Sequence, residues 1–208
     1  MPDKLAARPS NWNLPNALTT LRILLVPLFG WVLLMDDGQD TSLRIWAFVI
    51  FTVAILTDKI DGEIARKRNL VTDFGKLMDP IADKALTGMA FVGLSIIGEL
   101  WWWVTLLVLG REWGITVLRL WIIRYGVMPA SRGGKIKTAL QAVALCGMLL
   151  PFRELSGQWE QIGTALWWVS VAIMVAAVVS TVATGLDYVR EAARVRREGQ
   201  AAATTSSS

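Results

Sequence analysis

The chain has 208 residues, of which 54% are hydrophobic and 18% are charged, and its formal net charge is +4. Soluble proteins carry about 25% charged residues, so this composition excludes an ordinary soluble globular domain. The chain has no histidine, which removes the commonest general base and the commonest metal ligand. Its one cysteine, Cys146, lies in an apolar run and is expected to pack in the core, because it has no partner for an internal disulfide.

The N-terminal segment is polar and lacks an apolar stretch that ends in a small-residue cleavage site, so we expect no removable signal peptide. After it, long apolar blocks predict an all-α membrane protein with six transmembrane helices. The blocks lie at about 18–35, 43–57, 81–98, 101–123, 138–152 and 162–186. Several are shorter than the ~20 residues that cross a bilayer. We therefore expect the second and third helices to continue into the polar segment between them.

These blocks predict three regions in chain order. Residues 1–17 form a cytoplasmic or interfacial N-terminal segment, and residues 18–190 form the six-helix membrane domain. Residues 191–208 form a tail that is first basic and then, after Glu198, of low complexity and expected to be disordered.

Lysine and arginine are concentrated at the N-terminus, in the second and fourth connections and in the tail. The remaining connections are acidic, very short or carry one arginine. By the positive-inside rule, this alternation predicts that both termini and the polar site face the cytoplasm. We expect a multi-pass protein of a bacterial cytoplasmic membrane, with membrane lipid and no nucleic acid among its partners.

Four carboxylates surround the second connection. Asp58 and Asp61 are three residues apart, and Asp79 and Asp83 are four apart, so each pair shares one face of a helix. An antiparallel hairpin of the two helices brings all four together, and hard divalent cations would neutralise them. Two Mg²⁺ or Mn²⁺ ions suit such oxygen ligands. The alternative is that the carboxylates are solvated or paired with nearby lysine and arginine.

Small residues lie among these acids, at Gly62, Ala65 and Gly75. Small side chains allow two helices to approach closely or allow a flat ligand to reach the backbone. Helix packing alone also explains them, and the two interpretations are compatible.

The run Asp58-x-x-Asp61-Gly62-x-x-Ala65-Arg66, followed after eight residues by Gly75-x-x-x-Asp79-x-x-x-Asp83, resembles the complete signature of the CDP-alcohol phosphotransferase family. The resemblance implies a six-helix membrane fold, a homodimer and a CDP-linked donor. It also implies a metal pair held by the four aspartates, with Asp83 as general base. The remaining signature positions are assigned to CDP binding, namely Gly62, Ala65, Arg66 and Gly75.

Two further segments bear on the first and fourth helices. Asn13 to Arg22 leads into the first helix, where Thr19 or Thr20 is a candidate cap. In the fourth apolar stretch, Arg111, Glu112 and Arg119 are ionisable groups in a costly environment, which indicates an interior polar site. Arg111 and Glu112 are adjacent and are expected to point in different directions, so a simple mutual salt bridge explains them poorly.

Arg132, Lys135 and Lys137 precede and begin the fifth helix. They are either a positive-inside anchor or, with Arg111 and Arg119, a pocket for a phosphate. These segments resemble the phosphatidylglycerophosphate synthases of the family, whose acceptor is glycerol 3-phosphate. Relatives that use inositol phosphate, serine or phosphatidylglycerol share the aspartate signature, so those acceptors remain alternatives.

The function expected from this resemblance is transfer of the phosphatidyl group of CDP-diacylglycerol to glycerol 3-phosphate, giving phosphatidylglycerophosphate and CMP. With no histidine and no nucleophile paired with a base, we expect direct transfer without a covalent intermediate. A cation transporter that uses the four aspartates is a remote alternative, although these acids lie at one membrane boundary. A structural membrane scaffold is a further alternative.

Overall fold

The computed structural model describes residues 13–67, 72–122 and 133–205. Within them, it leaves out the side chains of 59–67, 73, 76, 119, 120, 122, 133–135 and 198–205. The regular structure of the described residues is entirely helical, as predicted. The chain divides into two compact units, Met1–Glu99 with Leu149–Leu155, and Leu100–Met148 with Ser156–Ser208.

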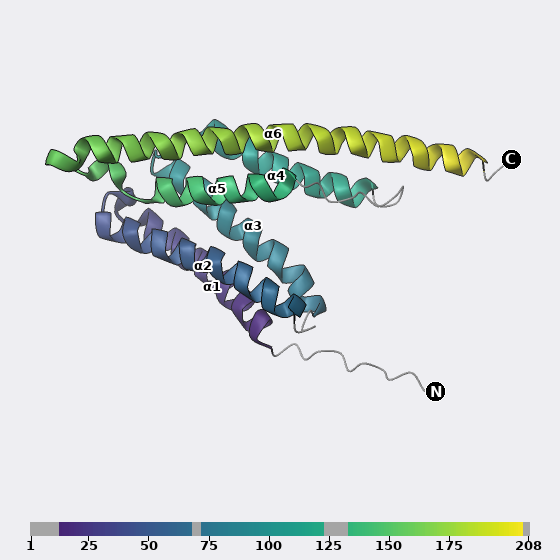
Figure 1. Ribbon diagram of the computed structural model, residues 1–208. Coiled ribbons are helices and arrows are strands. Elements are labelled where there is room, and N and C mark those ends of the chain that lie inside the picture. Colours follow the sequence, from purple (N-terminus) through teal and green to yellow (C-terminus); the bar gives the residue numbers. More distant parts are fainter. Residues whose placement is uncertain (1–12, 68–71, 123–132, 206–208) are drawn as a thin grey trace. The chain divides into compact units, whose positions relative to one another are not determined.

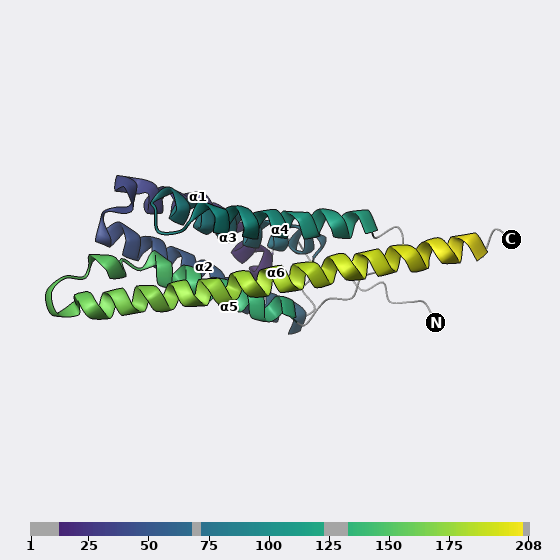
Figure 2. The same cartoon turned by 90° about the horizontal axis from the view of Figure 1, so that it is seen from above.

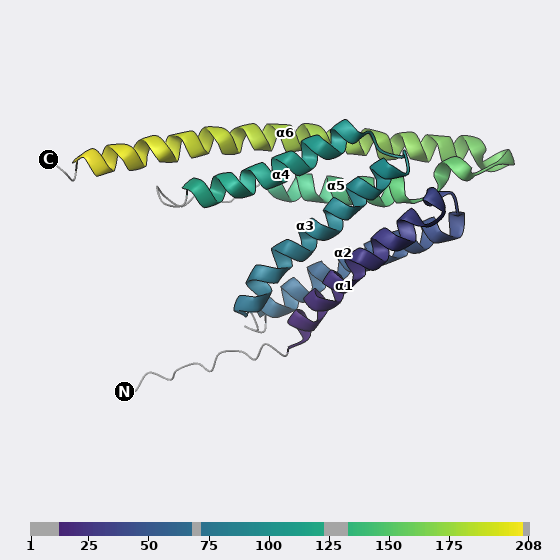
Figure 3. The same cartoon turned by 180° about the vertical axis from the view of Figure 1, so that it is seen from behind.

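The first unit contains the helices α1 (Leu14–Leu34), α2 (Thr41–Lys67) and α3 (Asp73–Ile96). The helix α1 packs against both α2 and α3, and Figures 1 and 3 show the three helices side by side. Two short 3₁₀ helices, η1 (Met35–Gly38) and η2 (Phe152–Glu154), also belong to this unit.

Aromatic and small side chains let these helices pack closely. The rings of Phe29 and Phe51 lie with their centroids 5.4 Å apart in the core between α1 and α2. On α3, a Cβ atom added at Gly93 would lie 2.6 Å from Leu33 Cδ2, so this glycine makes room for the Leu33 side chain of α1. The close packing brings α1 against the part of the chain that carries the aspartate signature.

Polar side chains outside the apolar stretches cap the N-terminal ends of α1 and α3. The Asn13 side chain accepts a hydrogen bond from the backbone N–H of Asn16 at 2.9 Å and caps α1, and Thr72 Oγ1 accepts one from Gly75 N at 3.0 Å and caps α3. The prediction that Thr19 or Thr20 caps the first helix is therefore wrong. The helix begins about a turn earlier, because Asn13 satisfies its first free N–H group and Pro15 fits its first turn.

The second unit contains α4 (Trp102–Ile122), α5 (Gly133–Leu149) and α6 (Glu160–Thr205), which follows the short 3₁₀ helix η3 (Gly157–Trp159). The helix α4 packs against α6, and α6 runs alongside α5 in Figure 2. Between α5 and α6, Gln141 Nε2 donates to Thr181 Oγ1 at 3.1 Å, and both residues are buried.

Large apolar side chains cover the outside of the helices, including Leu24, Trp46, Leu106 and Val179. Such exposure is unfavourable in water and suits contact with lipid. Among the described residues, four segments are long and apolar enough to cross a membrane, Leu14–Gly38, Thr41–Asp58, Ile136–Glu154 and Gly157–Arg197. This supports an integral membrane protein, whereas six crossings and their orientation stay predictions.

The helix ends differ from the apolar stretches in two places. As predicted, α2 and α3 extend beyond the apolar stretches into the connection between them, to Lys67 and from Asp73. The tail after Glu198 was expected to be disordered, but α6 continues to Thr205. Three successive alanines, Ala201, Ala202 and Ala203, lie in this stretch, and alanine is the strongest helix former, so its sequence is compatible with a continued helix.

Candidate active site

Three buried polar residues lie on one face of α1, at Asn16, Thr19 and Arg22. They are three residues apart, so they follow one another along the face of the helix. An arginine that is 1% exposed in an apolar helix is costly unless an anion pairs with it. The anions are supplied by the aspartate signature on α2 and α3.

Arg22 pairs with Asp58 on α2. Its Nη1 atom lies 2.7 Å from Asp58 Oδ1, and its Nε atom donates to the backbone oxygen of Ala54 at 3.2 Å. The Asp58 side chain is 39% exposed, so one end of the ion pair is buried and the other is open to the surroundings. This arrangement orients the first signature carboxylate at the C-terminal end of the apolar part of α2.

Asp79 on α3 is held by Thr19, whose hydroxyl donates to Asp79 Oδ1 at 2.6 Å. Beside it, Thr72 Oγ1 donates to Asn16 Oδ1 at 2.9 Å. A Cβ atom at Gly75 would lie 3.0 Å from Asn16 Oδ1 and 3.8 Å from Asp79 Oδ2. The glycine therefore leaves room for Asn16 Oδ1, which a side chain at this position would crowd, whereas Asp79 Oδ2 would lie at an ordinary contact distance.

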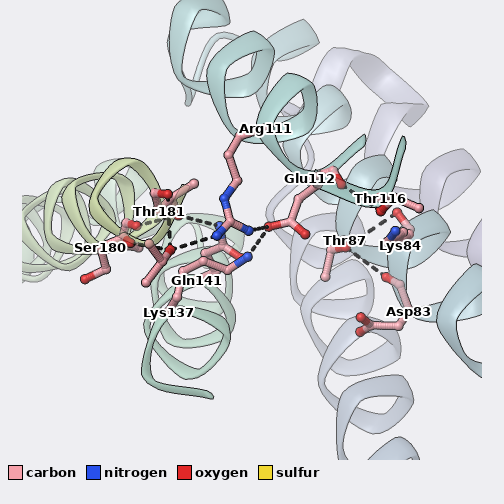
Figure 4. Close-up of polar contacts among 12 residues, drawn as sticks. Asp83, Lys84, Thr87, Arg111, Glu112, Thr116, Lys137, Gln141, Ser180 and Thr181 are labelled. Carbon is pink, nitrogen blue, oxygen red and sulfur yellow. Dashed lines mark hydrogen bonds and ion pairs between the residues drawn. The ribbon is translucent and has the colours of Figure 1, made fainter. Parts of the chain in front are cut away.

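Asp83 lies one turn after Asp79 on α3 and is half-buried. The hydroxyl of Thr87 donates to the backbone oxygen of Asp83 at 2.8 Å, as Figure 4 shows. The four-residue spacing places Asp83 and Asp79 on the same side of α3. Three aspartates of the signature thus belong to one compact unit.

A second polar cluster lies in the other unit and joins α4, α5 and α6 (Figure 4). Arg111 Nη2 donates to Thr184 Oγ1 at 2.8 Å, and Arg111 Nη1 lies 3.3 Å from Glu112 Oε1. Lys137, which is buried, donates to the same Glu112 oxygen. The guanidinium also lies 5.7 Å from the centre of the Tyr188 ring. The cluster places two cations around one carboxylate.

The chain is similar to known proteins over most of its length. Residues 12–183 match the CDP-alcohol phosphatidyltransferase family. The chain belongs to this family. A protein of Mycobacterium tuberculosis (strain H37Rv) named "Probable phosphatidylglycerophosphate synthase" is 48% identical over 191 residues, which cover 92% of this chain and 87% of the relative.

Two further relatives carry a name that states a reaction, CDP-diacylglycerol–glycerol-3-phosphate 3-phosphatidyltransferase. The protein from Bacillus subtilis (strain 168) is 37% identical, with 85% of this chain and 93% of the relative covered. The protein from Shigella flexneri serotype 5b is 36% identical, with 78% and 88% covered. The resemblance that the aspartate signature indicated is therefore confirmed at the level of the family.

The carboxylate oxygens of the signature aspartates Asp58, Asp79 and Asp83 fit the divalent cations expected for a CDP-alcohol phosphatidyltransferase. Carboxylate oxygens are what Mg²⁺ and Mn²⁺ prefer, and Gly75 leaves space beside Asp79. Among the side chains that the structure describes, no three Asp, Glu, Cys or His groups lie close enough to hold a metal ion. The Asp61 side chain lies outside that set, and Arg22 and Thr19 already engage Asp58 and Asp79.

The structure describes part of the site predicted from the sequence. It brings Arg111 and Lys137 together, as the phosphate-pocket hypothesis requires. The remaining predicted residues have side chains outside the described ones, and their roles stay predictions. They are Asp61, Gly62, Ala65, Arg66, Arg119, Arg132 and Lys135.

Sequence reasoning missed the contact between Arg111 and Glu112, which it judged unsuitable for a salt bridge. The two side chains leave α4 in different directions, but both are long enough to curve toward each other, and Lys137 draws the carboxylate from α5. It also missed Asn16 and Arg22 as part of the site. Their three-residue spacing with Thr19 inside an apolar run was the available signal.

Proposed function

We propose that this CDP-alcohol phosphatidyltransferase transfers the phosphatidyl group of CDP-diacylglycerol to sn-glycerol 3-phosphate and releases CMP. The observation that carries the proposal is its similarity to proteins named for this synthesis, at 48% and 37% identity over 92% and 85% of the chain. The composition supports it, because the donor and the product are membrane lipids and the helices have apolar outer faces.

The donor binds at the aspartate cluster of the first unit. Asp58, Asp61, Asp79 and Asp83 hold two divalent cations, Mg²⁺ or Mn²⁺, which supply neutralising charge at the pyrophosphate when bound. Asn16, Thr19 and Arg22 support these carboxylates from α1. The CDP moiety lies along the small and basic positions of the signature, which are Gly62, Ala65, Arg66 and Gly75.

The reaction is a direct displacement at phosphorus. Asp83 accepts the proton of the acceptor's primary hydroxyl, whose oxygen attacks the lipid-side phosphorus of the donor. A new phosphorus–oxygen bond forms, and the bond between that phosphorus and the oxygen of CMP breaks. No covalent intermediate on the protein is required.

The acceptor's phosphate binds to the basic residues of the second unit. Arg111 grips it with its planar guanidinium, whereas Lys137 contributes a point charge. Arg119, Arg132 and Lys135 are further candidates from the same part of the sequence. The observed proximity of Arg111 and Lys137 around Glu112 supports this assignment.

In the membrane, the protein forms six transmembrane helices with both termini and the site on the cytoplasmic face. The placement of lysine and arginine supports this orientation. The protein acts as a homodimer in a bacterial cytoplasmic membrane.

The deciding experiment offers the purified protein CDP-diacylglycerol with glycerol 3-phosphate, inositol phosphate, serine or phosphatidylglycerol in separate reactions. CMP release and the identity of the lipid product are measured with Mg²⁺ or Mn²⁺ and with EDTA. We expect metal-dependent product only with glycerol 3-phosphate. A higher kcat/KM with another acceptor would assign the protein to a different member of the same family.

A further inference from the structure

Glu112 lies between the two cations that the proposed acceptor site uses. One oxygen of its carboxylate, Oε1, contacts both Arg111 Nη1 and Lys137 Nζ. Figure 4 shows dashed lines to this carboxylate from the Arg111 guanidinium and from the Lys137 amine. A positive-inside anchor has no need for a carboxylate in this position, because anchoring requires cations facing the membrane surface.

The second carboxylate oxygen, Oε2, has no hydrogen-bond or ion-pair partner among the described residues. The Glu112 side chain is 27% exposed, whereas that of Lys137 is 6% exposed. The carboxylate is therefore more exposed than the lysine that contacts it, and among the described residues Oε2 is left to accept a hydrogen bond from a ligand. An ionised carboxylate only accepts hydrogen bonds, so its natural partner in a ligand is a hydroxyl or amine donor.

The charges in this cluster also favour a particular kind of ligand. Arg111 and Lys137 contribute two positive charges and Glu112 contributes one negative charge, so the three side chains carry one net positive charge. A phosphate bound here is attracted by the two cations, whereas a second phosphate close by would be repelled by the Glu112 carboxylate. The cluster therefore suits a phosphate monoester that carries a hydroxyl next to its phosphate.

We propose that Glu112 is a specificity-determining residue that accepts a hydrogen bond from the C2 hydroxyl of the acceptor while Arg111 and Lys137 hold its phosphate. In glycerol 3-phosphate, C2 is the carbon next to the one that bears the phosphate. A phosphate on the two cations that flank Glu112 brings that hydroxyl to the carboxylate. This inference rests on the proposed function and adds the reason why a glycerol phosphate is selected.

The alternative role for Glu112 is to position Arg111 and Lys137 without contacting the acceptor. The two roles make different predictions for an acceptor that lacks the C2 hydroxyl. Such an acceptor is 3-hydroxypropyl phosphate, which keeps the phosphate, the chain length and the primary hydroxyl that attacks phosphorus. If Glu112 only positions the cations, its loss should lower kcat/KM equally for both acceptors. If it contacts the hydroxyl, its loss should lower kcat/KM only for glycerol 3-phosphate.

The experiment measures kcat/KM for both acceptors with the wild type, Glu112→Gln and Glu99→Gln in detergent. Glu99→Gln is the matched control, because Glu99 is a carboxylate paired with a buried arginine, Arg44, at 2.8 Å in the other unit. A charged hydrogen bond is stronger than a neutral one by enough to change kcat/KM about 5- to 10-fold. We expect the preference for glycerol 3-phosphate to fall by about this factor in Glu112→Gln and to stay unchanged in Glu99→Gln.

If Glu112→Gln lowers kcat/KM by the same factor for both acceptors, the preference for glycerol 3-phosphate is unchanged. This result would overturn the inference and leave the proposed function intact. A wild type that makes no lipid product from glycerol 3-phosphate would overturn the proposed function itself. If Glu112→Gln does not fold, Glu112→Asp serves instead. Aspartate keeps the negative charge, but its shorter side chain places the carboxylate oxygen farther from the C2 hydroxyl. The preference for glycerol 3-phosphate is therefore again expected to fall.

Discussion

Arg22 on α1 and Asp58 on α2 form an ion pair whose Nη1 and Oδ1 atoms lie 2.7 Å apart. The arginine is buried, and the aspartate belongs to the signature proposed to bind metal ions. A cation of the protein itself therefore pairs with a carboxylate that is also proposed to bind a metal ion. Arg44 offers a matched comparison, because it is also buried and pairs with Glu99 at 2.8 Å, away from the signature.

We predict that Arg22→Gln lowers the thermal stability more in EDTA than in Mg²⁺, because a bound cation compensates for the lost positive charge. Breaking a buried ion pair costs about 3–5 kcal/mol, and exposure of Asp58 reduces this to about 2 kcal/mol. Arg44→Gln should lower the Tm by the same amount in both conditions. The measurement is thermal unfolding in detergent. Equal losses for Arg22→Gln with and without metal would contradict the prediction.

The four signature aspartates should each be essential for turnover but not for folding. Asp58→Asn, Asp61→Asn, Asp79→Asn and Asp83→Asn are each expected to remove most CMP release, because each deletes a charged oxygen ligand. Asp187→Asn is the control, since Asp187 is 70% exposed and only pairs loosely with Arg190 on its own helix. Elution on size-exclusion chromatography checks folding. Near-normal turnover in two or more of the four variants would refute the metal-cluster interpretation.

Adjacent threonines on α1 allow a second test of the support for the carboxylates. Thr19 Oγ1 donates to Asp79 at 2.6 Å, whereas Thr20 Oγ1 donates only to the backbone oxygen of Asn16 at 2.9 Å. A hydrogen bond to a charged group is worth about 1.5–3 kcal/mol. Thr19→Val should therefore lower kcat about 10-fold or more with little change in the acceptor KM. Thr20→Val should behave like the wild type, and equal effects of the two changes would argue against a role for Thr19.

The acceptor site can be tested without altering a charge. Arg111→Lys should raise the acceptor KM about 10-fold, because lysine cannot make two parallel hydrogen bonds to a phosphate. Gly185→Ala should raise it more modestly, since the new Cβ would lie 3.3 Å from Arg111 Nε and Cγ and displace the side chain. Gly114→Ala is the control, because its Cβ would meet no atom within 4 Å. Titration of glycerol 3-phosphate at saturating CDP-diacylglycerol measures these effects, and an unchanged KM in both test variants would place the phosphate elsewhere.

The orientation in the membrane is tested by cysteine labelling. A cysteine introduced between positions 67 and 76 should react with an impermeant reagent only from the cytoplasmic side, and one between 38 and 41 only from the outside. The wild type, with Cys146 as its single cysteine, measures the background. The reverse pattern would refute the orientation drawn from lysine and arginine placement.

The sequence by itself determined the helical membrane character, the family and the four aspartates, because these depend on composition and on spacing within single helices. A three- or four-residue spacing defines a helix face whatever the helix packs against. The start of α1 at Asn13 and the continuation of α6 to Thr205 were missed, because the apolar stretches mark membrane-compatible length and not the helix ends.

Only the tertiary structure decided which faces meet. It pairs Arg22 with Asp58, which is 36 positions later, and Thr19 with Asp79, which is 60 positions later. It also brings Lys137 from α5 to the carboxylate of Glu112 on α4. These contacts depend on how separate helices pack, and local spacing carries no information about the partner across a helix interface. The spacing of Asn16, Thr19 and Arg22 could therefore indicate a polar helix face, but not that this face meets Asp58 and Asp79.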